Sequence, residues 1–473
     1  MSQAGDAIED FDLVIIGTGS GNSLIGPEMD GWRIAIVERD PVFGGTCLNR
    51  GCIPTKMLVY TADVAESARH AGRYGVHATV DGADWPAIRD RVFGRIDPIA
   101  TGGRDYRLGL ENVTVFTGEG RFVGERTVEV GGSRIRGAQV VIAAGARPHL
   151  PEGVPGLDPT MGPTVPFHTS DTIMRIDALP EHLVVVGGGF IACELAHMFG
   201  ALGSRVTIIQ RSDVLLTAED RQIAETFTEL ARRRFEVIAS AHLDHVAHGN
   251  GGIEVRIDVA GQQRAVVGDV LLVATGRTPN GDRLDAHLAG VDVRGSAVVV
   301  DDAGRTSAPG VWALGDVNGR HQLKHMANGE ARVVRHNLSH PDDLRHFDHR
   351  PAPHGVFTFP QIGAVGLTEA AARAQHGDAV DVVTHPYSGA AYGWALEDCD
   401  GYVKLVGDRR TRTLLGAHMI GYHAATAVQL LIQGMHLGAT VDELAVGQIW
   451  IHPALPEVIE QALLKLIEAF DAR

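Results

Sequence analysis

Two stretches of the chain each consist of a buried strand that leads directly into a glycine-rich turn. The first comprises residues 11–21 and the second residues 182–192, and each has a Gly-x-Gly sequence after the strand. Glycines at that point allow a tight turn and let backbone N–H groups approach a pyrophosphate. The repeat therefore predicts an α/β chain with two dinucleotide-binding units, and no other feature of the sequence limits the fold as strongly.

The first unit also has an acidic residue at a suitable spacing. After Gly17 and Gly19, a second apolar stretch ends at Glu38, 21 residues beyond Gly17. A carboxylate there can accept hydrogen bonds from an adenosine ribose. Asn22 stands where a third glycine is usual, so helix packing should be slightly altered. A glycine-rich loop in an unrelated α/β protein is the alternative, but strand, glycines and acid together favour a bound dinucleotide.

The second unit has a cation where the first has an acid. Its glycine turn opens a helix, and the strand at residues 205–209 leads to Gln210 and Arg211. An acid at this point would bind a free 2′-hydroxyl, whereas Arg211 offers a charge for a 2′-phosphate. The sequence therefore favours NADP over NAD, with a solvated surface role for Arg211 as the alternative. The unit closes at Gly276.

Two cysteines, Cys47 and Cys52, come after the first unit. They lie in the run from Gly44 to Lys56, which begins with two glycines and in which Pro54 opens an amphipathic stretch. Because proline is tolerated in the first helical turn, Cys52 should lie at or just before a helix N-terminus, where the dipole lowers the pKa of a thiol. Two close thiols, one of them stabilised as a thiolate, form a two-electron redox pair.

A structural disulfide and a zinc site are the alternatives for this pair. The chain is long and has only four cysteines, unlike a small framework held by disulfides. A zinc site needs about four ligands, and the sequence has no second cysteine pair. Redox function is therefore the preferred interpretation.

Length and charge restrict the location and the partners. The 473 residues are enough for two or three domains. No apolar run approaches the roughly 20 residues that span a bilayer, and the first ten residues lack a signal-peptide pattern. We therefore expect a cytoplasmic protein. The net charge of −16 argues against nucleic acid or an anionic membrane as a partner.

The remaining segments alternate between predicted helices and strands. Helices are expected at about residues 55–71, 71–110, 327–338, 368–375, 424–437 and 456–470. Strands are expected at about residues 113–116, 127–130, 138–143, 298–300, 355–359, 401–406 and 413–420.

Three polar residues near the ends of these elements are candidate site residues. Asp316 comes after a short strand, where a carboxylate can contact the sugar-alcohol chain of a cofactor. His452 precedes the last helix and Glu457 falls in its first turn. A nearby carboxylate would orient the imidazole as a general acid–base group. A structural histidine is the alternative, since the chain has 23 histidines.

The motifs together resemble those of the flavoprotein disulfide reductases, a family that includes glutathione reductase, dihydrolipoamide dehydrogenase, mercuric reductase and mycothione reductase. The likeness covers essentially the whole chain. It rests on the Gly-Gly-Thr-Cys-x4-Cys run that ends at Cys52 and on the His-Pro…Glu run that begins at His452. Within the family, the turn that contains Asn22, the run 47–57 and the segment 323–328 are most similar to the mycothione reductases.

The resemblance implies an α/β fold with two Rossmann-like domains and a C-terminal α+β dimerisation domain. The expected FAD-binding domain comprises residues 1–155 and 279–350. The expected NADPH-binding domain is inserted at residues 156–278, and the dimerisation domain is expected at residues 351–473. The chain should therefore form a homodimer.

The resemblance also implies a role for each site residue. Cys52 would face the flavin and Cys47 would attack the substrate disulfide. His452, oriented by Glu457, would come from the partner subunit, and Lys56 would pair with Glu194 beside the flavin ring. The expected FAD contacts are Gly17, Gly19, Ser20, Glu38, Gly45, Thr46, Lys56, Gly120, Ala144, Gly145 and Asp316. The expected NADPH contacts are Gly187, Gly189, Ile191, Glu194, Arg211 and Gly276. Cys193 and Cys399 match no family role.

The activity implied by the resemblance is NADPH-dependent reduction of a small thiol disulfide, mycothione. Dihydrolipoamide dehydrogenase activity with NAD is the alternative, which Gln210 and Arg211 disfavour. A non-catalytic assembly subunit is disfavoured because every redox residue is present. A soluble transhydrogenase is disfavoured because it would have no use for the dithiol.

Overall fold

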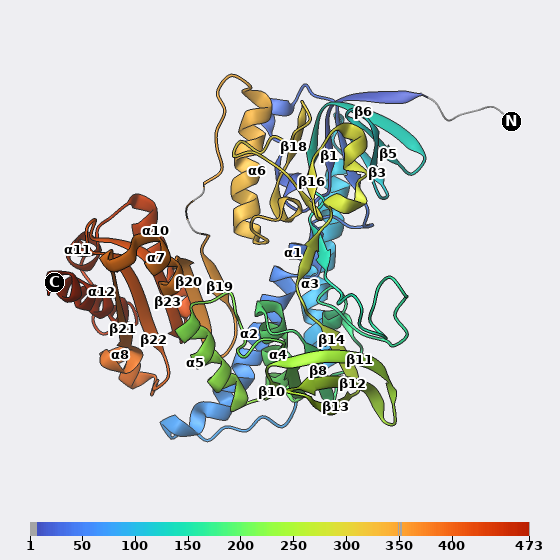
Figure 1. Ribbon diagram of the computed structural model, residues 1–473. Helices are drawn as coiled ribbons and strands as arrows, with labels where there is room; N and C mark the ends of the chain where they lie inside the picture. Colours follow the sequence, from blue (N-terminus) through green and yellow to red (C-terminus); the bar gives the residue numbers. More distant parts are fainter. Residues whose placement is uncertain (1–6, 349, 351, 473) are drawn as a thin grey trace.

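The computed structural model describes residues 7–348, 350 and 352–472, which form three lobes (Figure 1). Two lobes are built on parallel sheets and the third on an antiparallel sheet, which confirms the predicted fold class. Residues 1–6, which make up most of the polar N-terminal segment, lie outside the described residues. So do residues 349 and 351, which flank the boundary predicted at residue 350. The other boundaries, at residues 155 and 278, stay predictions.

The first lobe is organised around a sheet in the order β3-β2-β1-β6-β5-β4, with β18 paired to β6. β1, β2, β3, β6 and β18 run parallel, while β4 and β5 are antiparallel additions. Its strands are β1 (Ile8–Ile16), β2 (Ile34–Glu38), β3 (Val113–Thr117), β4 (Arg121–Gly124), β5 (Thr127–Val130), β6 (Ser133–Ile142) and β18 (Val311–Ala313). Leu13, Ile15 and Val140 are fully buried, as expected for strands covered on both faces.

Four α-helices belong to this lobe or leave it: α1 (Gly45–Asn49), α2 (Cys52–His70), α3 (Trp85–Leu108) and α6 (Lys324–Ser339). The continuous helix predicted at residues 71–110 is wrong. A short 3-10 turn ends at Gly75, whose φ of 76° is left-handed, and no helix covers residues 75–84. Asp84 then accepts a hydrogen bond from the N–H of Ala87 and caps the start of α3.

The connection between β1 and β2 also differs from the expected pattern. The sequence predicted a helix with altered packing after the first glycine turn, but residues 17–33 contain only two 3-10 helices, η1 (Gly21–Ser23) and η2 (Pro27–Met29). Asn22 accepts hydrogen bonds from Arg107 at both its side-chain oxygen and its carbonyl oxygen, each 2.8 Å long. Gly26 is extended and Pro27 comes next, so a continuous helix is excluded here.

The second lobe contains a parallel sheet in the order β10-β9-β8-β14 and an antiparallel sheet β11-β12-β13. Its elements are β8 (His182–Val186), α4 (Phe190–Leu202), β9 (Arg205–Ile209), α5 (Arg221–Arg232), β10 (Glu236–Ile238), β11 (Ala241–Gly249), β12 (Gly252–Val259), β13 (Gln262–Gly268) and β14 (Val270–Val273). The sequence analysis did not anticipate β11–β13. A two-stranded ribbon of β7 (Ala146–Pro148) and β15 (Arg277–Pro279) connects this lobe to the first. A small hairpin of β16 (Val293–Arg294) and β17 (Ala297–Val298) comes after it. The sequence predicted a strand at residues 298–300 at this point.

The third lobe has a five-stranded antiparallel sheet in the order β19-β20-β23-β22-β21. Its elements are β19 (His354–Val356), β20 (Gln361–Gly366), α7 (Glu369–His376), β21 (Val380–Pro386), α8 (Ala391–Ala395), β22 (Tyr402–Asp408), β23 (Thr413–Gly421), α9 (Ala424–Ala427), α10 (Gln429–Leu437), α11 (Val441–Val446) and α12 (Glu457–Asp471). β20 and β21 were not predicted, and the helix expected at residues 424–437 is divided at Val428.

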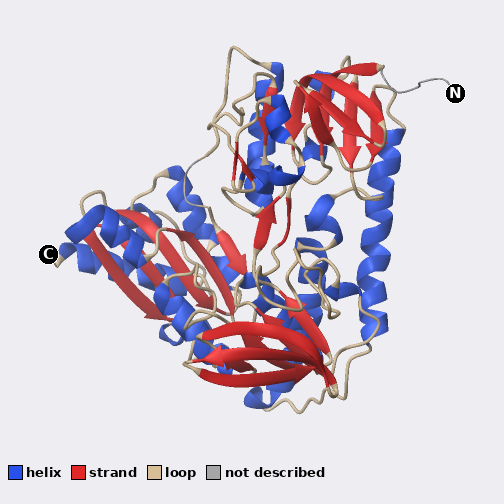
Figure 2. Ribbon diagram, turned by 45° about the vertical axis from the view of Figure 1, so that its right-hand side comes forward, coloured by secondary structure: helices blue, strands red, loops and turns tan. Residues whose placement is uncertain are grey.

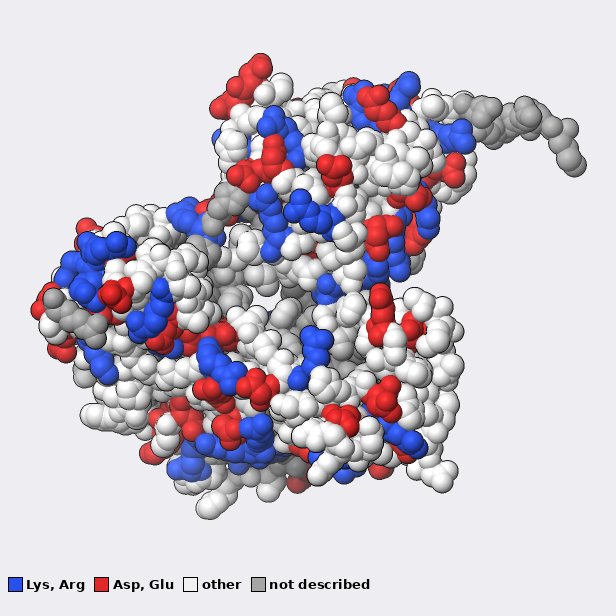
Figure 3. All heavy atoms as spheres, viewed as in Figure 1, with Lys and Arg blue, Asp and Glu red and all other residues white. Residues whose placement is uncertain are grey.

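Helix α2 connects the lobes, because it starts in the first and packs against α4 of the second. Figure 2 shows the strands in separate groups with helices between them. On the face in Figure 3, acidic and basic side chains are interspersed, and the surface is hollowed between the upper lobe and the two lower ones. Among the described residues, no helix is long and apolar enough to cross a membrane.

Candidate active site

The two cysteines of the predicted redox pair lie at the junction of two helices. Cys47 is inside the short helix α1, Gly51 connects the helices, and Cys52 is the first residue of α2. Both are free thiols, Cys47 half-buried and Cys52 exposed in the single chain. Cys52 therefore lies at a helix N-terminus, where the dipole favours a thiolate.

A hydrogen bond between the two thiols shifts their pKa values in opposite directions. The bond from Cys47 is the main cause that lowers the pKa of Cys52 to about 7, and the Lys56 ammonium lowers it further. The same bond, together with burial, raises the pKa of Cys47 well above its usual range. Cys52 is thus the thiol that ionises more readily, and Cys47 keeps its proton.

Lys56 and Glu194 form an ion pair next to the cysteines. Lys56 is one turn after Cys52 in α2, and its Nζ lies 2.5 Å from Oε2 of Glu194 in α4. Glu194 is buried, and its Oε1 accepts a hydrogen bond from the N–H of Phe357 at 2.9 Å. Lys56 Nζ also lies 4.6 Å from the centre of the Phe357 ring. The pair therefore joins elements from all three lobes at the redox site.

The first glycine turn lies against the redox helix. Gly17 has a φ of 103°, and a Cβ there would lie 2.3 Å from the carbonyl oxygen of Ala143. A Cβ on Gly45 would lie 2.8 Å from the Cα of Gly19, so α1 begins in close contact with the turn. A Cβ on Gly19 itself would meet nothing closer than 4.0 Å. This open space beside the backbone fits a bound dinucleotide.

Glu38, the acid at the end of β2, forms hydrogen bonds with Thr18 of this turn. Glu38 Oε2 accepts hydrogen bonds from the N–H and hydroxyl of Thr18, at 2.9 and 2.5 Å, and its Oε1 accepts from the N–H of Asp40. A carboxylate has about four lone pairs, so Glu38 keeps capacity for a ribose hydroxyl. Ser20 ends the turn and accepts a hydrogen bond from Lys324 Nζ at 2.9 Å.

The other expected FAD contacts fall into two groups. Thr46 in α1 and Gly145, with a φ of 66° and open space around its Cα, face the same region as Arg277, which reaches both Thr46 Oγ1 and the carbonyl of Ala146. At the other two expected contacts, Gly120 and Ala144, neighbouring residues of the protein already take up the space or the polar atom. A Cβ on Gly120 would lie 2.9 Å from Val37, and Ala144 accepts a hydrogen bond from Asn280 through its carbonyl.

Asp316 lies in the 3-10 helix η7 (Gly315–Asn318), directly after β18. Burial raises the pKa of its carboxyl, and Arg277 and Lys324 partly oppose that shift. Among the described residues no hydrogen bond from another side chain to this carboxylate is recorded, so it is available to accept from a hydroxyl-rich ligand.

The second glycine turn leads directly into a full helix. A Cβ on Gly187 would lie 2.3 Å from the carbonyl of Ala274, while Gly189 and Gly276 have open space around them. Helix α4 starts one residue after Gly189 and carries Ile191 in its first turn. Arg211 is exposed beyond β9, and within the described residues its guanidinium has no recorded partner. This region fits a nicotinamide dinucleotide with an added phosphate.

His452 and Glu457 form the predicted pair in the third lobe. Their Nδ1 and Oε1 atoms lie 2.7 Å apart, and the hydrogen bond from His452 lowers the pKa of Glu457. His452 is exposed, and α12 lies at the outer end of its lobe, away from α1 (Figure 1). Within the described residues of the single chain, no contact of His452 with either cysteine is recorded.

Sequence reasoning assigned no role to two cations of this region. Arg277 is 8% exposed at its side chain and its buried Nε has no hydrogen-bond partner among the described residues. Lys324 was noted only as part of the segment 323–328. The sequence did contain a signal for each of them. Arg277 follows a short strand and Gly276, a predicted cofactor residue, and Lys324 lies at the start of a helix that comes soon after Asp316.

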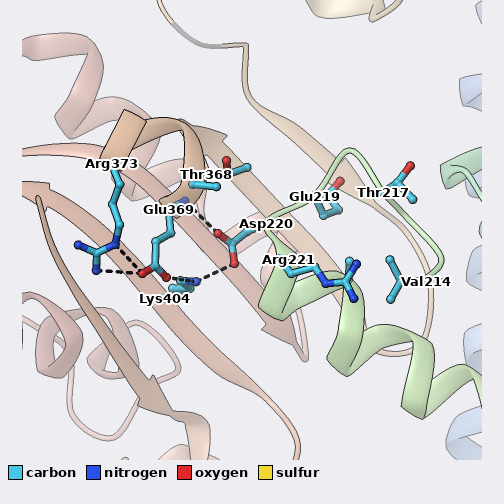
Figure 4. A pocket seen from close by; sticks show the side chains of 11 residues that line it. Val214, Thr217, Glu219, Asp220, Arg221, Thr368, Glu369, Arg373 and Lys404 are labelled. Carbon is cyan, nitrogen blue, oxygen red and sulfur yellow. Dashed lines mark hydrogen bonds and ion pairs between the residues drawn. The ribbon is translucent and has the colours of Figure 1, made fainter. Parts of the chain in front are cut away.

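A cavity of about 440 Å³ lies elsewhere, between α5 and α7 (Figure 4). There Lys404 Nζ is 2.8 Å from both Asp220 and Glu369, and Glu369 also pairs with Arg373. Burial tends to raise the pKa of Asp220, but Lys404 and the N–H of Glu369 lower it overall. Because these charges are paired, we interpret the cluster as a contact between two lobes and not as the reaction site.

Comparison with known proteins supports this picture. The model of the pyridine nucleotide-disulphide oxidoreductase family matches residues 11–331, and that of the family's dimerisation domain matches residues 352–463. The chain is 48% identical over 469 residues to mycothione reductase of Mycobacterium tuberculosis strain H37Rv, which covers 97% of this chain and 100% of the relative. It is 31% identical to dihydrolipoyl dehydrogenase of Chlamydia muridarum, covering 96% and 97%.

A solved structure is also similar along the whole chain. The flavoprotein disulfide reductase RclA of Escherichia coli aligns with a TM-score of 0.83 and 30% identity, covering 96% of this chain and 99% of that one. The family uses a flavin and a pyridine nucleotide, and its dimerisation domain is present here as the third lobe. The chain is therefore an enzyme that belongs to the pyridine nucleotide-disulphide oxidoreductase family.

Proposed function

We propose that the chain forms a homodimer that uses NADPH and FAD to reduce mycothione to mycothiol. The observation that carries this proposal is the pair at the junction of α1 and α2, in which Cys47 keeps its proton and Cys52, beside Lys56, ionises near neutral pH. The name of the 48% identical relative supports mycothione as the substrate.

The thiols carry out two exchange steps. Cys47 Sγ attacks one sulfur of the substrate disulfide, so the substrate S–S bond breaks and a mixed disulfide with Cys47 forms. Cys52, the better stabilised thiolate, then attacks the Cys47 sulfur, releases the second substrate thiolate and forms the Cys47–Cys52 disulfide. When bound, NADPH and FAD supply the two electrons that reopen this disulfide.

A base is needed because the pKa of Cys47 is raised. His452 of a second copy would take the Cys47 proton and give it to the departing substrate thiolate. Glu457 accepts the hydrogen bond from His452 Nδ1, so Nε2 is the ring nitrogen left for the proton transfer. Since α12 is distant from α1 within one chain, the active site requires two copies.

The cofactor sites are assigned from the two glycine turns. We assign FAD to the turn at Gly17 and Gly19, with Glu38 on its adenosine ribose and Asp316 on its ribityl chain. NADPH is assigned to the turn at Gly187 and Gly189, since its neighbouring cation is available for the 2′-phosphate.

The test is oxidation of NADPH and of NADH by the purified protein, with mycothione, glutathione disulfide and lipoamide offered in turn. Turnover with NADPH and mycothione alone is the expected result. Turnover with NADH and lipoamide would instead place the chain with the dihydrolipoyl dehydrogenases and leave Arg211 a surface residue.

A further inference from the structure

The two glycine turns of this chain lead into different local structures. After Gly189, helix α4 runs for 13 residues, so its N–H groups and dipole are available for a phosphate. After Gly19 there is only η1, three residues long, and no α-helix begins before β2. The first turn therefore lacks the positive helix end that neutralises a pyrophosphate in such units.

Lys324 supplies a full positive charge at this same turn. It is the first residue of α6, which packs against η1, and its Nζ lies 2.9 Å from Ser20 Oγ. Ser20 comes directly after Gly19. Its hydroxyl donates a hydrogen bond of 3.5 Å to Oδ1 of Asn328, which is also in α6. An ammonium has three donors, and only the bond to Ser20 is recorded among the described residues.

The charges near Lys324 do not form a close ion pair with it. The carboxylate of Asp316 is within electrostatic range, and Arg277 is a second cation in that range. No contact within 4 Å between Lys324 and an acidic side chain is recorded for the described residues. In the protein alone, the charge of the Lys324 ammonium is therefore only partly balanced by acidic side chains. It is available to neutralise an anion bound at the first glycine turn.

We propose that Lys324 binds the pyrophosphate of the FAD and replaces the helix dipole that the first glycine turn lacks. The proposal rests on the assignment of FAD to this turn under the proposed function. It adds a specific cofactor-binding residue outside the glycine turn, on a helix about 300 residues away in the sequence.

FAD binding to apoprotein tests this assignment. Lys324→Met should weaken FAD binding about 10- to 100-fold, the range for one charge-assisted hydrogen bond, and the deficit should shrink at high salt. Lys324→Arg should restore most of the affinity. Lys465→Met is the matched control, because Lys465 is exposed and, among the described residues, its one recorded hydrogen bond is to the carbonyl of Thr384. Equal FAD affinity of Lys324→Met and wild type would overturn the proposal.

Lysine labelling of the wild-type chain provides a measurement that needs no variant. The sequence has only four lysines, and of these Lys56 and Lys404 are in ion pairs, so an amine-reactive reagent with detection by mass spectrometry resolves each site. Lys324 should react in the apoprotein and be protected by FAD and by ADP, which contains the pyrophosphate, but not by riboflavin. Lys465 should react in every sample.

The two proposals fail in different ways. Full labelling of Lys324 in protein saturated with FAD would overturn the role of Lys324 and leave the proposed reaction untouched. Protection by riboflavin and not by ADP would overturn it also, because the lysine would then contact the flavin ring. Wild-type protein that takes up no FAD would overturn the proposed function itself.

Discussion

The hydrogen bond from Cys47 to Cys52 predicts how the thiolate responds when its donor is removed. This bond is the largest cause that lowers the pKa of Cys52 from 9.0 to about 7. At pH 7 the lowered value keeps about half of Cys52 as thiolate, against about 1% at the ordinary value. The Cys47 donor, the Lys56 ammonium and the backbone hydrogen bond together therefore change the thiolate population about 50-fold near neutral pH, and the donor contributes the largest part.

Two substitutions separate the donor from the sulfur. Cys47→Ser keeps an O–H group that can donate, so Cys52 should still titrate at or below about pH 7. Cys47→Ala removes the donor and leaves Lys56 and the helix N-terminus, so the midpoint should rise to between about 8 and 9. Because the pKa is lowered, the thiolate should be present above the midpoint and lost below it.

The assay is the long-wavelength absorbance of a thiolate next to oxidised flavin, measured from acid to alkaline pH in the FAD-loaded variants. Both variants should lack disulfide turnover while they keep this band, and Cys52→Ser should lack the band. Identical midpoints for Cys47→Ser and Cys47→Ala would refute the hydrogen bond as the cause. A band that persists in Cys52→Ser would reverse the roles of the two cysteines.

Four further substitutions have outcomes that the structure predicts. Arg211→Met should raise the KM for NADPH at least about tenfold and leave that for NADH unchanged in steady-state assays. Glu457→Gln should slow mycothione turnover about tenfold or more while flavin reduction by NADPH keeps its rate. Lys404→Met should lower the free energy of unfolding by about 3 kcal/mol in urea titrations, because it leaves Asp220 buried without its cation. Since the pKa of Asp220 is lowered, its contribution is present near neutral pH and lost as the pH falls through the folded value, so Asp220→Asn should flatten the acid side of the stability profile.

Features specified by local sequence were predicted well. The strand at residues 182–186, its glycine turn and the next helix were found because buried strands and glycine turns leave short signals. The contact of His452 with Glu457 is expected from five residues of spacing across a helix start. The contact of Lys56 with Glu194, 138 residues apart, has no local signal and came only from the family resemblance.

Features that depend on distant pairing were missed. The strands β11, β12 and β13 are stabilised by one another, and half-exposed stretches such as residues 262–268 have no strong apolar alternation. The break at residues 75–84 was missed because helical periodicity on either side outweighed Gly75 and Gly82. Similarly, β20 and β21, which were also missed, belong to a sheet in which β20 pairs with β23, a strand distant in the sequence.

The glycine fingerprint shows how a functional prediction can be based on a local structure that differs from the expected one. Gly17, Gly19 and Glu38 have the spacing of a dinucleotide site, and Asn22 was the one sign that the helix in that unit is altered. In the structure Asn22 is bonded to Arg107 and the helix is absent, so the dipole that normally justifies the fingerprint is absent too. Charge neutralisation has to come from elsewhere in the chain if the site is to hold a pyrophosphate. The start of α6, far away in sequence and adjacent in space, is where a lysine meets that requirement.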